Sequence, residues 1–222
     1  MATTITLAVL AAGVLGAQTE DAKRLEAAAT VFSEVMDAGD KAIPQDLLEK
    51  AKCAVIVPGL KKGAFIIGAK YGRGFLSCRN KSGVGWSAPG AVRVEGGSVG
   101  FQIGGSETDV ILLVMNDRGV QRLLSSKFTL GGDAAVAAGP VGREATAQTD
   151  AFMTAEILSW SRSRGVFAGV SLQGATLRQD LDSNKSLYGR PIENKDIVTT
   201  DLRPPAAAQR LLSLLNKYSS RR

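Results

Sequence analysis

The sequence predicts a single α+β domain built on a curved, mostly antiparallel β-sheet, a barrel-like sandwich. We expect helices before the sheet, one helix inserted in it and a helix at the C-terminus. The chain has 222 residues, of which 45% are hydrophobic, and this is enough for one substantial core. Its 25 glycines and low aromatic content (5%) favour short strands joined by tight turns over a helical bundle.

The first 19 residues are uncharged and include an apolar run from Ile5 to Ala17. This pattern is typical of a secretory signal peptide, with the small residues Gly16 and Ala17 at the cleavage position. The basic residues that usually precede such a run are absent, so a start farther upstream or a buried helix are the alternatives. The run is also shorter than the ~20 residues of a spanning helix. We expect residues 1–19 to be a signal peptide and the protein to be exported, either periplasmic or envelope-associated. The alternative is a cytoplasmic protein peripheral to a membrane.

Two helices are expected before the sheet. From Glu20 to Gly39, apolar residues recur every three or four positions, which predicts an amphipathic helix that ends at Gly39. Its buried face holds Leu25, Ala28, Ala29, Phe32, Val35 and Met36. Its polar face is net acidic, so we expect it to pack on the sheet and not to insert in an anionic membrane. Pro44 favours the start of a second, short helix.

The sheet is expected to begin with the apolar run CAVIV at Cys53. Pro58-Gly59 predicts a first turn, Lys61-Lys62-Gly63 a second turn, and Tyr71-Gly72 the tip of a hairpin. Further strands are predicted in AVRVEGG, SVGFQIGG and DVILLVMN, and a short inserted helix in DRGVQRLLSS. The segments FMTAEILSWSR and GVFAGVSLQGATLRQD predict two more strands, joined at 162–165.

The polar sequence after Asp180 has few apolar residues, which predicts an extended wrap or a linker. The last residues, AAAQRLLSLLNKYSSRR, predict an amphipathic helix. We therefore expect the folded domain to span residues 20–185, followed at 186–222 by an extended segment and a C-terminal helix.

The segment from Lys50 to Val94 concentrates the positive charge of the chain. It holds nine cations and no Asp or Glu, namely Lys50, Lys52, Lys61, Lys62, Lys70, Arg73, Arg79, Lys81 and Arg93. The whole chain has 27 Lys and Arg against 21 Asp and Glu, so acids outnumber cations outside this segment. Cations at turns usually keep a sheet soluble and its edges unpaired, which is the simpler interpretation. Because nine like charges repel one another, we favour one basic face that binds an anionic partner.

The composition argues against most enzyme classes. The chain has no histidine, which removes imidazole general bases and nearly all the usual zinc, copper and iron ligand sets. GVGWSA at Gly83–Ala88 formally fits a dinucleotide fingerprint, but Pro89 and Gly90 follow it where a helix is required. We expect no catalytic activity, no cofactor and no metal.

The two cysteines, Cys53 and Cys78, each lie in an apolar run. We favour two buried thiols that pack as small hydrophobic residues. In an exported protein they would instead form one disulfide between neighbouring strands.

Four phrases, in order, resemble the SYLF domain, also described as the Ysc84-type actin-binding or lipid-binding domain. They are AKCAVIVPGLKKGAFIIGAKYGRG, SVGFQIGGSETDVILLVMND, GGDAAVAAGPVGR and GVFAGVSLQGATLRQD. The likeness covers about residues 22–185. It implies a non-enzymatic domain that in eukaryotic members binds phosphoinositides and other anionic phospholipids, and in some members actin. The apparent leader indicates a bacterial exported member of the family.

The resemblance also implies particular residues. Lys61 and Lys62 of PGLKKG, with Lys70 and Arg73 of AKYGRG, match positions expected to contact lipid headgroups. We extend this candidate anion-binding set to the other cations Arg79, Lys81 and Arg93. Asp133 and Arg143 match family-signature positions of unknown role, for which a buried ion pair and a ligand contact are the two interpretations.

Charge and resemblance together predict peripheral binding to an anionic phospholipid surface through these cations. Actin or another acidic protein is the alternative partner. Nucleic acid is not expected, because no aromatic residues alternate with the cations to stack on bases.

Overall fold

The computed structural model describes residues 6–65, 67–99, 104–140, 155–163, 166–169 and 174–219. The helical segments there are α1 (Thr6–Met36), η1 (Gly39–Lys41), α2 (Gln45–Lys50), α3 (Asp117–Leu123), α5 (Leu181–Tyr188), α6 (Asn194–Thr199), η3 (Ala206–Ala208) and α7 (Gln209–Tyr218). The strands are β1 (Cys53–Phe65), β2 (Ile67–Cys78), β3 (Gly90–Val99), β4 (Gly104–Val114), β5 (Lys127–Thr129), β6 (Val136–Ala138), β7 (Ile157–Ser163), β8 (Val166–Gly169) and β9 (Thr176–Gln179).

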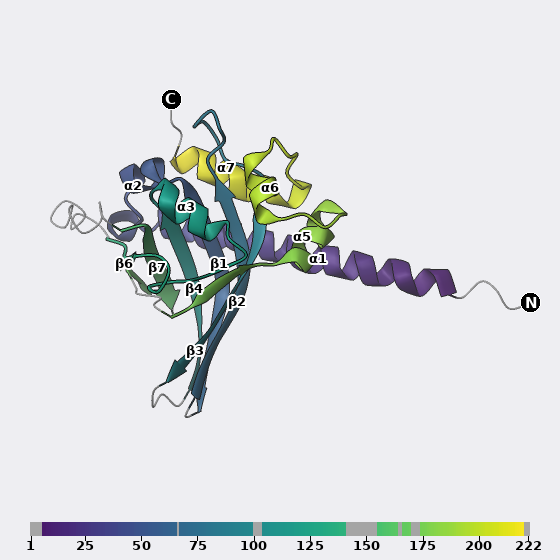
Figure 1. Ribbon diagram of the computed structural model, residues 1–222, viewed down its shortest axis with the longest axis horizontal. Coiled ribbons are helices and arrows are strands. Elements are labelled where there is room, and N and C mark those ends of the chain that lie inside the picture. Colours follow the sequence, from purple (N-terminus) through teal and green to yellow (C-terminus); the bar gives the residue numbers. More distant parts are fainter. Residues whose placement is uncertain are drawn as a thin grey trace, which may run out of the picture.

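One curled sheet forms the centre of the molecule (Figure 1). Its strand order is β5-β9-β3-β2-β1-β4-β7-β6, with β8 paired to β7, and every pairing is antiparallel except β6 with β7. The sheet bends into a half-barrel that helices cover on both faces. This confirms the predicted fold class of a single α+β domain with a curved, mostly antiparallel sheet.

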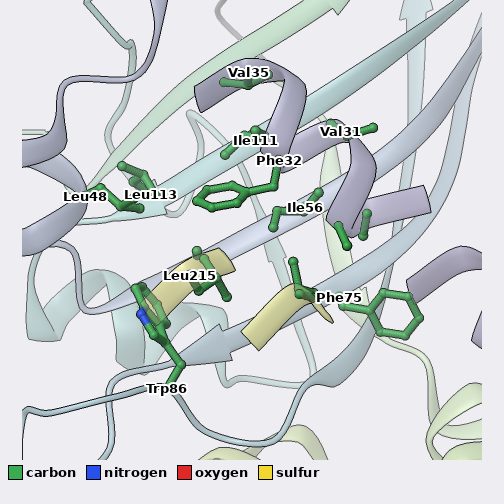
Figure 2. Close-up of a cluster of buried hydrophobic side chains, with 14 of the residues drawn as sticks. Val31, Phe32, Val35, Leu48, Ile56, Phe75, Trp86, Ile111, Leu113 and Leu215 are labelled. Carbon is green, nitrogen blue, oxygen red and sulfur yellow. The ribbon is translucent and has the colours of Figure 1, made fainter. Parts of the chain in front are cut away.

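Alternation along β1 gives the sheet two cores. Ala54 and Ile56 face the layer made by α1, α2 and α7, while Cys53, Val55 and Val57 face the layer that includes α3 and α6. Figure 2 shows part of the first core, where Phe32 of α1 and Leu215 of α7 lie against the sheet. Burial on both faces explains why CAVIV is a continuous apolar run and not an alternating one.

The two helices predicted before the sheet are confirmed. Leu25, Ala28, Ala29 and Phe32 of α1 have no exposed surface, and α2 begins directly after Pro44. Helix α1 is continuous from Thr6 to Met36, so the apolar leader and the amphipathic segment form one helix. Figure 1 shows the N-terminal part of α1 projecting beyond α5.

The turns predicted in the first hairpin are wrong. Pro58-Gly59 forms a bulge inside β1, where the register shifts between Val57 and Leu60 and Gly59 adopts a φ of +60°. Lys61 and Lys62 therefore continue β1, and the chain reverses only between Phe65 and Ile67.

Tyr71-Gly72 lies in the middle of β2, so Gly72 is there for packing and not for a turn. A Cβ at Gly72 would lie 2.7 Å from Leu60 Cδ1, and one at Gly74 would lie 2.1 Å from the carbonyl oxygen of Ile56. These glycines let β2 approach the bulged part of β1 closely.

Two more predicted helices are confirmed. The inserted helix is α3 and the C-terminal helix is α7.

The prediction of an extended wrap after Asp180 is wrong, because this segment forms the helices α5 and α6. Asp180 caps the start of α5 by accepting a hydrogen bond from Ser183 N, and Gly189 ends it in the left-handed conformation. The late segment predicted as one strand contains two, β8 and β9.

The cysteines are bonded to each other, which corrects the favoured interpretation as two free thiols. Cys53 is the first residue of β1 and Cys78 the last residue of β2, and antiparallel pairing places them directly opposite each other. The alternative of a disulfide between neighbouring strands is the one that the structure contains.

Candidate anion-binding surfaces

The cations of the Lys50–Val94 segment do not form one face. The β1–β2 hairpin separates them, because Cys53 pairs with Cys78 at one end and Lys62 pairs with Lys70 near the other. Lys50, Lys52, Arg79 and Lys81 belong to the disulfide end, and Lys61, Lys62 and Lys70 to the opposite end. The expectation of a single continuous basic surface is therefore not met.

Four of the nine cations have acidic partners that come from outside the segment. Lys50 lies 3.7 Å from Asp46, Lys52 lies 3.4 Å from Asp117, Arg73 lies 2.7 Å from Asp180, and Arg93 lies 3.4 Å from Glu95. Two of these acids, Asp117 and Asp180, come from distant parts of the chain. These contacts lower the net charge that the segment presents to a partner.

Arg79 has a structural position. Its guanidinium donates to the carbonyl oxygens of Leu48 and Ser219, at 3.2 Å and 2.8 Å, and lies 4.2 Å from the ring centroid of Trp86. Trp86 Nε1 donates in turn to Ser219 Oγ at 2.9 Å. These contacts join α2, the end of β2 and the end of α7, so Arg79 is unsuited to contact an external anion.

Lys81 is exposed in the turn after β2 and lines a cavity of about 290 Å³ together with Lys52 and Arg79, beside the disulfide.

Of the two predicted signature residues, the structure describes Asp133. Asp133 is exposed and accepts a hydrogen bond from Thr129 N at 2.7 Å, so it is not the buried member of an ion pair. Arg143 lies outside the described residues.

The first surface that remains, which we call the lysine cluster, consists of Lys61, Lys62 and Lys70. Lys62 is half-buried and pairs across the sheet with Lys70 on one side and Ser106 on the other. Burial and the neighbouring ammonium group of Lys70 together lower the pKa of Lys62. Lys61 is exposed and points to the opposite face, between Tyr71 and Glu107 in register.

The second surface, which we call the arginine row, consists of Arg73, Arg93, Arg178 and Lys127. These residues hold directly opposed positions on β2, β3, β9 and β5. Arg73 forms an ion pair with Asp180. Arg93 and Arg178 both pair with the carboxylate of Glu95, with N–O distances of 3.4 Å and 3.7 Å. Sequence reasoning missed Arg178 and Lys127, because only the strand register places Arg178 opposite Arg93 and Lys127 opposite Arg178.

A groove of about 900 Å³ runs between α1 and the sheet. Its lining mixes acids, among them Glu34 and Asp109, with the cations Lys23, Arg24 and Arg162. Arg162 of β7 pairs with both Glu34 and Asp109 and so ties α1 to the sheet. The predicted packing of this acidic helix on the sheet is thus confirmed.

The structure thus combines a curled sheet, helices on both of its faces and two separate surface groups of cations. A family model described as "Ysc84: Las17-binding protein actin regulator" matches residues 95–218, and the chain belongs to this family. The predicted resemblance is therefore confirmed, and the match extends past the domain end expected at residue 185.

Several curated relatives are similar to the chain. SH3 domain-containing YSC84-like protein 1 from Homo sapiens is 33% identical over 204 residues, covering 90% of this chain and 59% of that protein. LAS seventeen-binding protein 3 from Saccharomyces cerevisiae is 34% identical over 90% of this chain and 44% of that protein. An SH3 domain-containing protein from Schizosaccharomyces pombe is 40% identical over 78% of this chain and 41% of its own length. The chain thus spans about half the length of these relatives.

Proposed function

We propose that this domain binds the surface of anionic phospholipid membranes through the lysine cluster, without catalytic activity. The observation that carries the proposal is the Lys62–Lys70 pair. The cross-strand neighbours of Lys62 are Lys70 and Ser106, and those of Lys70 are Lys62 and Gly96, so none of these register neighbours is acidic. Two adjacent ammonium groups repel each other, and a phosphate group placed between them would relieve that repulsion.

The expected energetics match peripheral binding. Each surface cation contributes on the order of 1 kcal/mol at an anionic membrane, and the attraction fades within a Debye length of about 8 Å at physiological salt. The Lys62–Lys70 pair therefore supports reversible, salt-sensitive association. Among the described residues, no helix combines the length and the hydropathy needed to cross a bilayer.

The test is sedimentation with vesicles of phosphatidylcholine that contain increasing fractions of phosphatidylglycerol, at low and at near-physiological salt. The wild-type protein should sediment in proportion to the anionic lipid, and K62E/K70E should not. Lys61 is left unchanged because Glu107 lies beside it in register. K185E/K195E is the matched control, since both lysines are exposed on α5 and α6 and the net charge changes equally. Wild-type protein that stays in the supernatant at low salt would refute the proposal.

A protein partner is the second candidate, and the arginine row is the surface that favours it. The family description names Las17 and actin, and LAS seventeen-binding protein 3 is named for a protein that it binds. Arg178 lies opposite Arg93, and Lys127 lies opposite Arg178 on the next strand, so they offer a row of cations to an acidic protein surface. Co-sedimentation with actin filaments that R178A/K127A abolishes and K185A/K195A retains would support this candidate.

Export of the protein is also a proposal. The disulfide supports it, because disulfides persist mainly in oxidising compartments. The α1 residues described in the core, from Leu25 to Val35, all follow residue 19, so removal of residues 1–19 would keep that packing. The relatives named above are from yeasts and a mammal, and they do not test the expected bacterial origin. Mass determination of the purified mature protein would show whether the segment is removed.

A further inference from the structure

The disulfide forms part of the wall of the cavity of about 290 Å³ described above. Cys53 and Cys78 both line this cavity, together with Val120 of α3 and Val198 of α6. Cys53 is 0% exposed and Cys78 is 6% exposed, so of the two residues Cys78 offers the accessible surface. The structure thus favours Cys78 as the point of contact for a small molecule in the cavity.

Positive charge predominates around this cavity. Lys52, Arg79 and Lys81 line it, and Asp117 is the one acid among the described residues of its lining. Asp117 pairs with Lys52, so Arg79 and Lys81 leave a net positive charge. Lys52 and Arg79 are also the sequence neighbours of the two cysteines. A positive environment attracts anions and favours a thiolate over a thiol.

These two features, access and positive charge, are the ones that promote thiol–disulfide exchange. A thiolate attacks one sulfur atom of a disulfide, and the other sulfur atom leaves as a thiolate. Access decides which sulfur is attacked, and nearby cations favour both an anionic reagent and the leaving thiolate. Here the cavity gives access to Cys78, and Lys52, the residue before Cys53, lines the same cavity.

We infer that Cys78 is a site of reversible thiolation by a small anionic thiol that enters this cavity. The incoming thiolate attacks Sγ of Cys78, the bond between the two Sγ atoms breaks, and its electron pair stays on Cys53 as a thiolate. The incoming sulfur is oxidised to the mixed disulfide while Cys53 is reduced, so no other oxidant or reductant takes part. Attack of the Cys53 thiolate on Sγ of Cys78 reverses the step and releases the thiol. This inference goes beyond the proposed lipid binding and does not depend on it.

The first test compares three thiols that share a two-carbon chain and differ in charge, namely mercaptoethanesulfonate (anionic), mercaptoethanol (neutral) and cysteamine (cationic). Each rate of disulfide opening in the folded wild-type protein is divided by the rate of the same thiol with hydroxyethyl disulfide, a neutral model compound. Quenching with N-ethylmaleimide and intact-mass measurement report the opened protein. The corrected rate of the anionic thiol should exceed that of the cationic thiol by about tenfold or more at low salt. Equal corrected rates, or no reaction, would overturn the inference.

Charge reversal at the cavity tests where this preference arises. K81E should reduce the advantage of the anionic thiol, because it places a carboxylate in the cavity lining. K185E is the matched control, since Lys185 is exposed on α5, is not part of that lining and gives the same change in net charge. K81Q replaces K81E if circular dichroism shows that K81E is unfolded. Equal effects of K81E and K185E would assign the preference to net charge and contradict the cavity as the site.

Two single-cysteine variants test which sulfur is the site. C53S retains Cys78 and C78S retains Cys53, and each variant is treated with the symmetrical disulfide of mercaptoethanesulfonate. The protein thiolate attacks this disulfide, forms the mixed disulfide and releases one mercaptoethanesulfonate. Cys78 should be thiolated faster than Cys53, because it is the more accessible residue. Equal rates, or faster thiolation of Cys53, would reject Cys78 as the site. If either variant is unfolded, the rates of the three thiols with the wild-type protein decide the question of access.

Discussion

Arg73 on β2 donates a hydrogen bond from Nε to Oδ2 of Asp180, at 2.7 Å, across 107 residues of sequence. Asp180 is only 1% exposed, and its carboxylate also contacts the hydroxyl group of Ser183. The pair connects the sheet to the start of α5. The sequence predicts that Arg73 contacts lipid headgroups. In the structure its guanidinium instead pairs with a buried carboxylate inside the domain.

Replacing Arg73 should therefore damage stability more than replacing its neighbour. R73M leaves the buried Asp180 carboxylate without its charged partner, and such loss typically costs about 3–5 kcal/mol. R93M is the matched control, since Arg93 lies directly opposite Arg73 but its acidic partner Glu95 is 37% exposed, and its effect should stay within about 1 kcal/mol. Urea denaturation of the two variants measures the difference. Equal midpoints would show that the Arg73–Asp180 pair contributes little.

The same pair should make stability depend on pH. Burial raises the pKa of Asp180, but the hydrogen bonds from Arg73 and Ser183 outweigh it and hold the pKa below its usual value. An unfolded Asp has a pKa of about 3.9, so the unfolded chain takes up this proton first as the pH falls. The stabilisation is present above about pH 4 and is lost as the pH falls through the folded pKa.

We therefore expect the difference in Tm between wild type and D180N to be largest near neutral pH and to shrink below about pH 4. Thermal denaturation of both proteins across this range provides the test. D180N is a suitable variant because asparagine still caps α5. A Tm difference that stays constant down to strongly acidic pH would rule out this linkage.

Arg79 should behave as a residue of the fold and not of the lipid site. R79A removes hydrogen bonds to main-chain carbonyls, each worth about 0.5–1.5 kcal/mol, and a stacking contact with Trp86, so a loss of about 2–4 kcal/mol is expected. R79K should recover only part of this, because a single ammonium group cannot reproduce the fork of the guanidinium. Guanidinium denaturation reports the stability. Vesicle sedimentation of folded R79K should match the wild type, and selective loss of lipid binding in R79K would assign Arg79 to the site instead.

Reduction of the disulfide should destabilise the domain. The bond closes a loop with a sequence separation of 25, and removing a link of this kind typically costs about 2–4 kcal/mol. The Tm of the wild type should fall in the presence of reductant. C53A/C78A should already have a lower Tm and should not respond to reductant. A wild-type Tm that is insensitive to full reduction would contradict this prediction.

Much of the fold could be predicted from sequence because local patterns reflect burial directly. The spacing of Leu25, Phe32 and Val35 predicts α1 and its buried face, and CAVIV predicts the first strand of the sheet. Glycine was harder to interpret, because the same residue serves a turn, a bulge or close packing. The sequence predicts a hairpin turn at Gly72, whereas in the structure its lack of a Cβ lets β2 approach Leu60.

The sequence by itself determined the family, the curled α+β fold, the excess of cations between Lys50 and Val94 and the absence of histidine chemistry. The tertiary structure decided which of those cations can meet a ligand. Charges are neutralised or grouped by neighbours in space, and strand register and helix packing set those neighbours. Asp180 thus forms an ion pair with Arg73, and main-chain carbonyl oxygens accept hydrogen bonds from Arg79. Arg178, which is distant in sequence, lies opposite Arg93. Lys62 and Lys70 lie side by side because antiparallel pairing of β1 with β2 places them directly opposite each other.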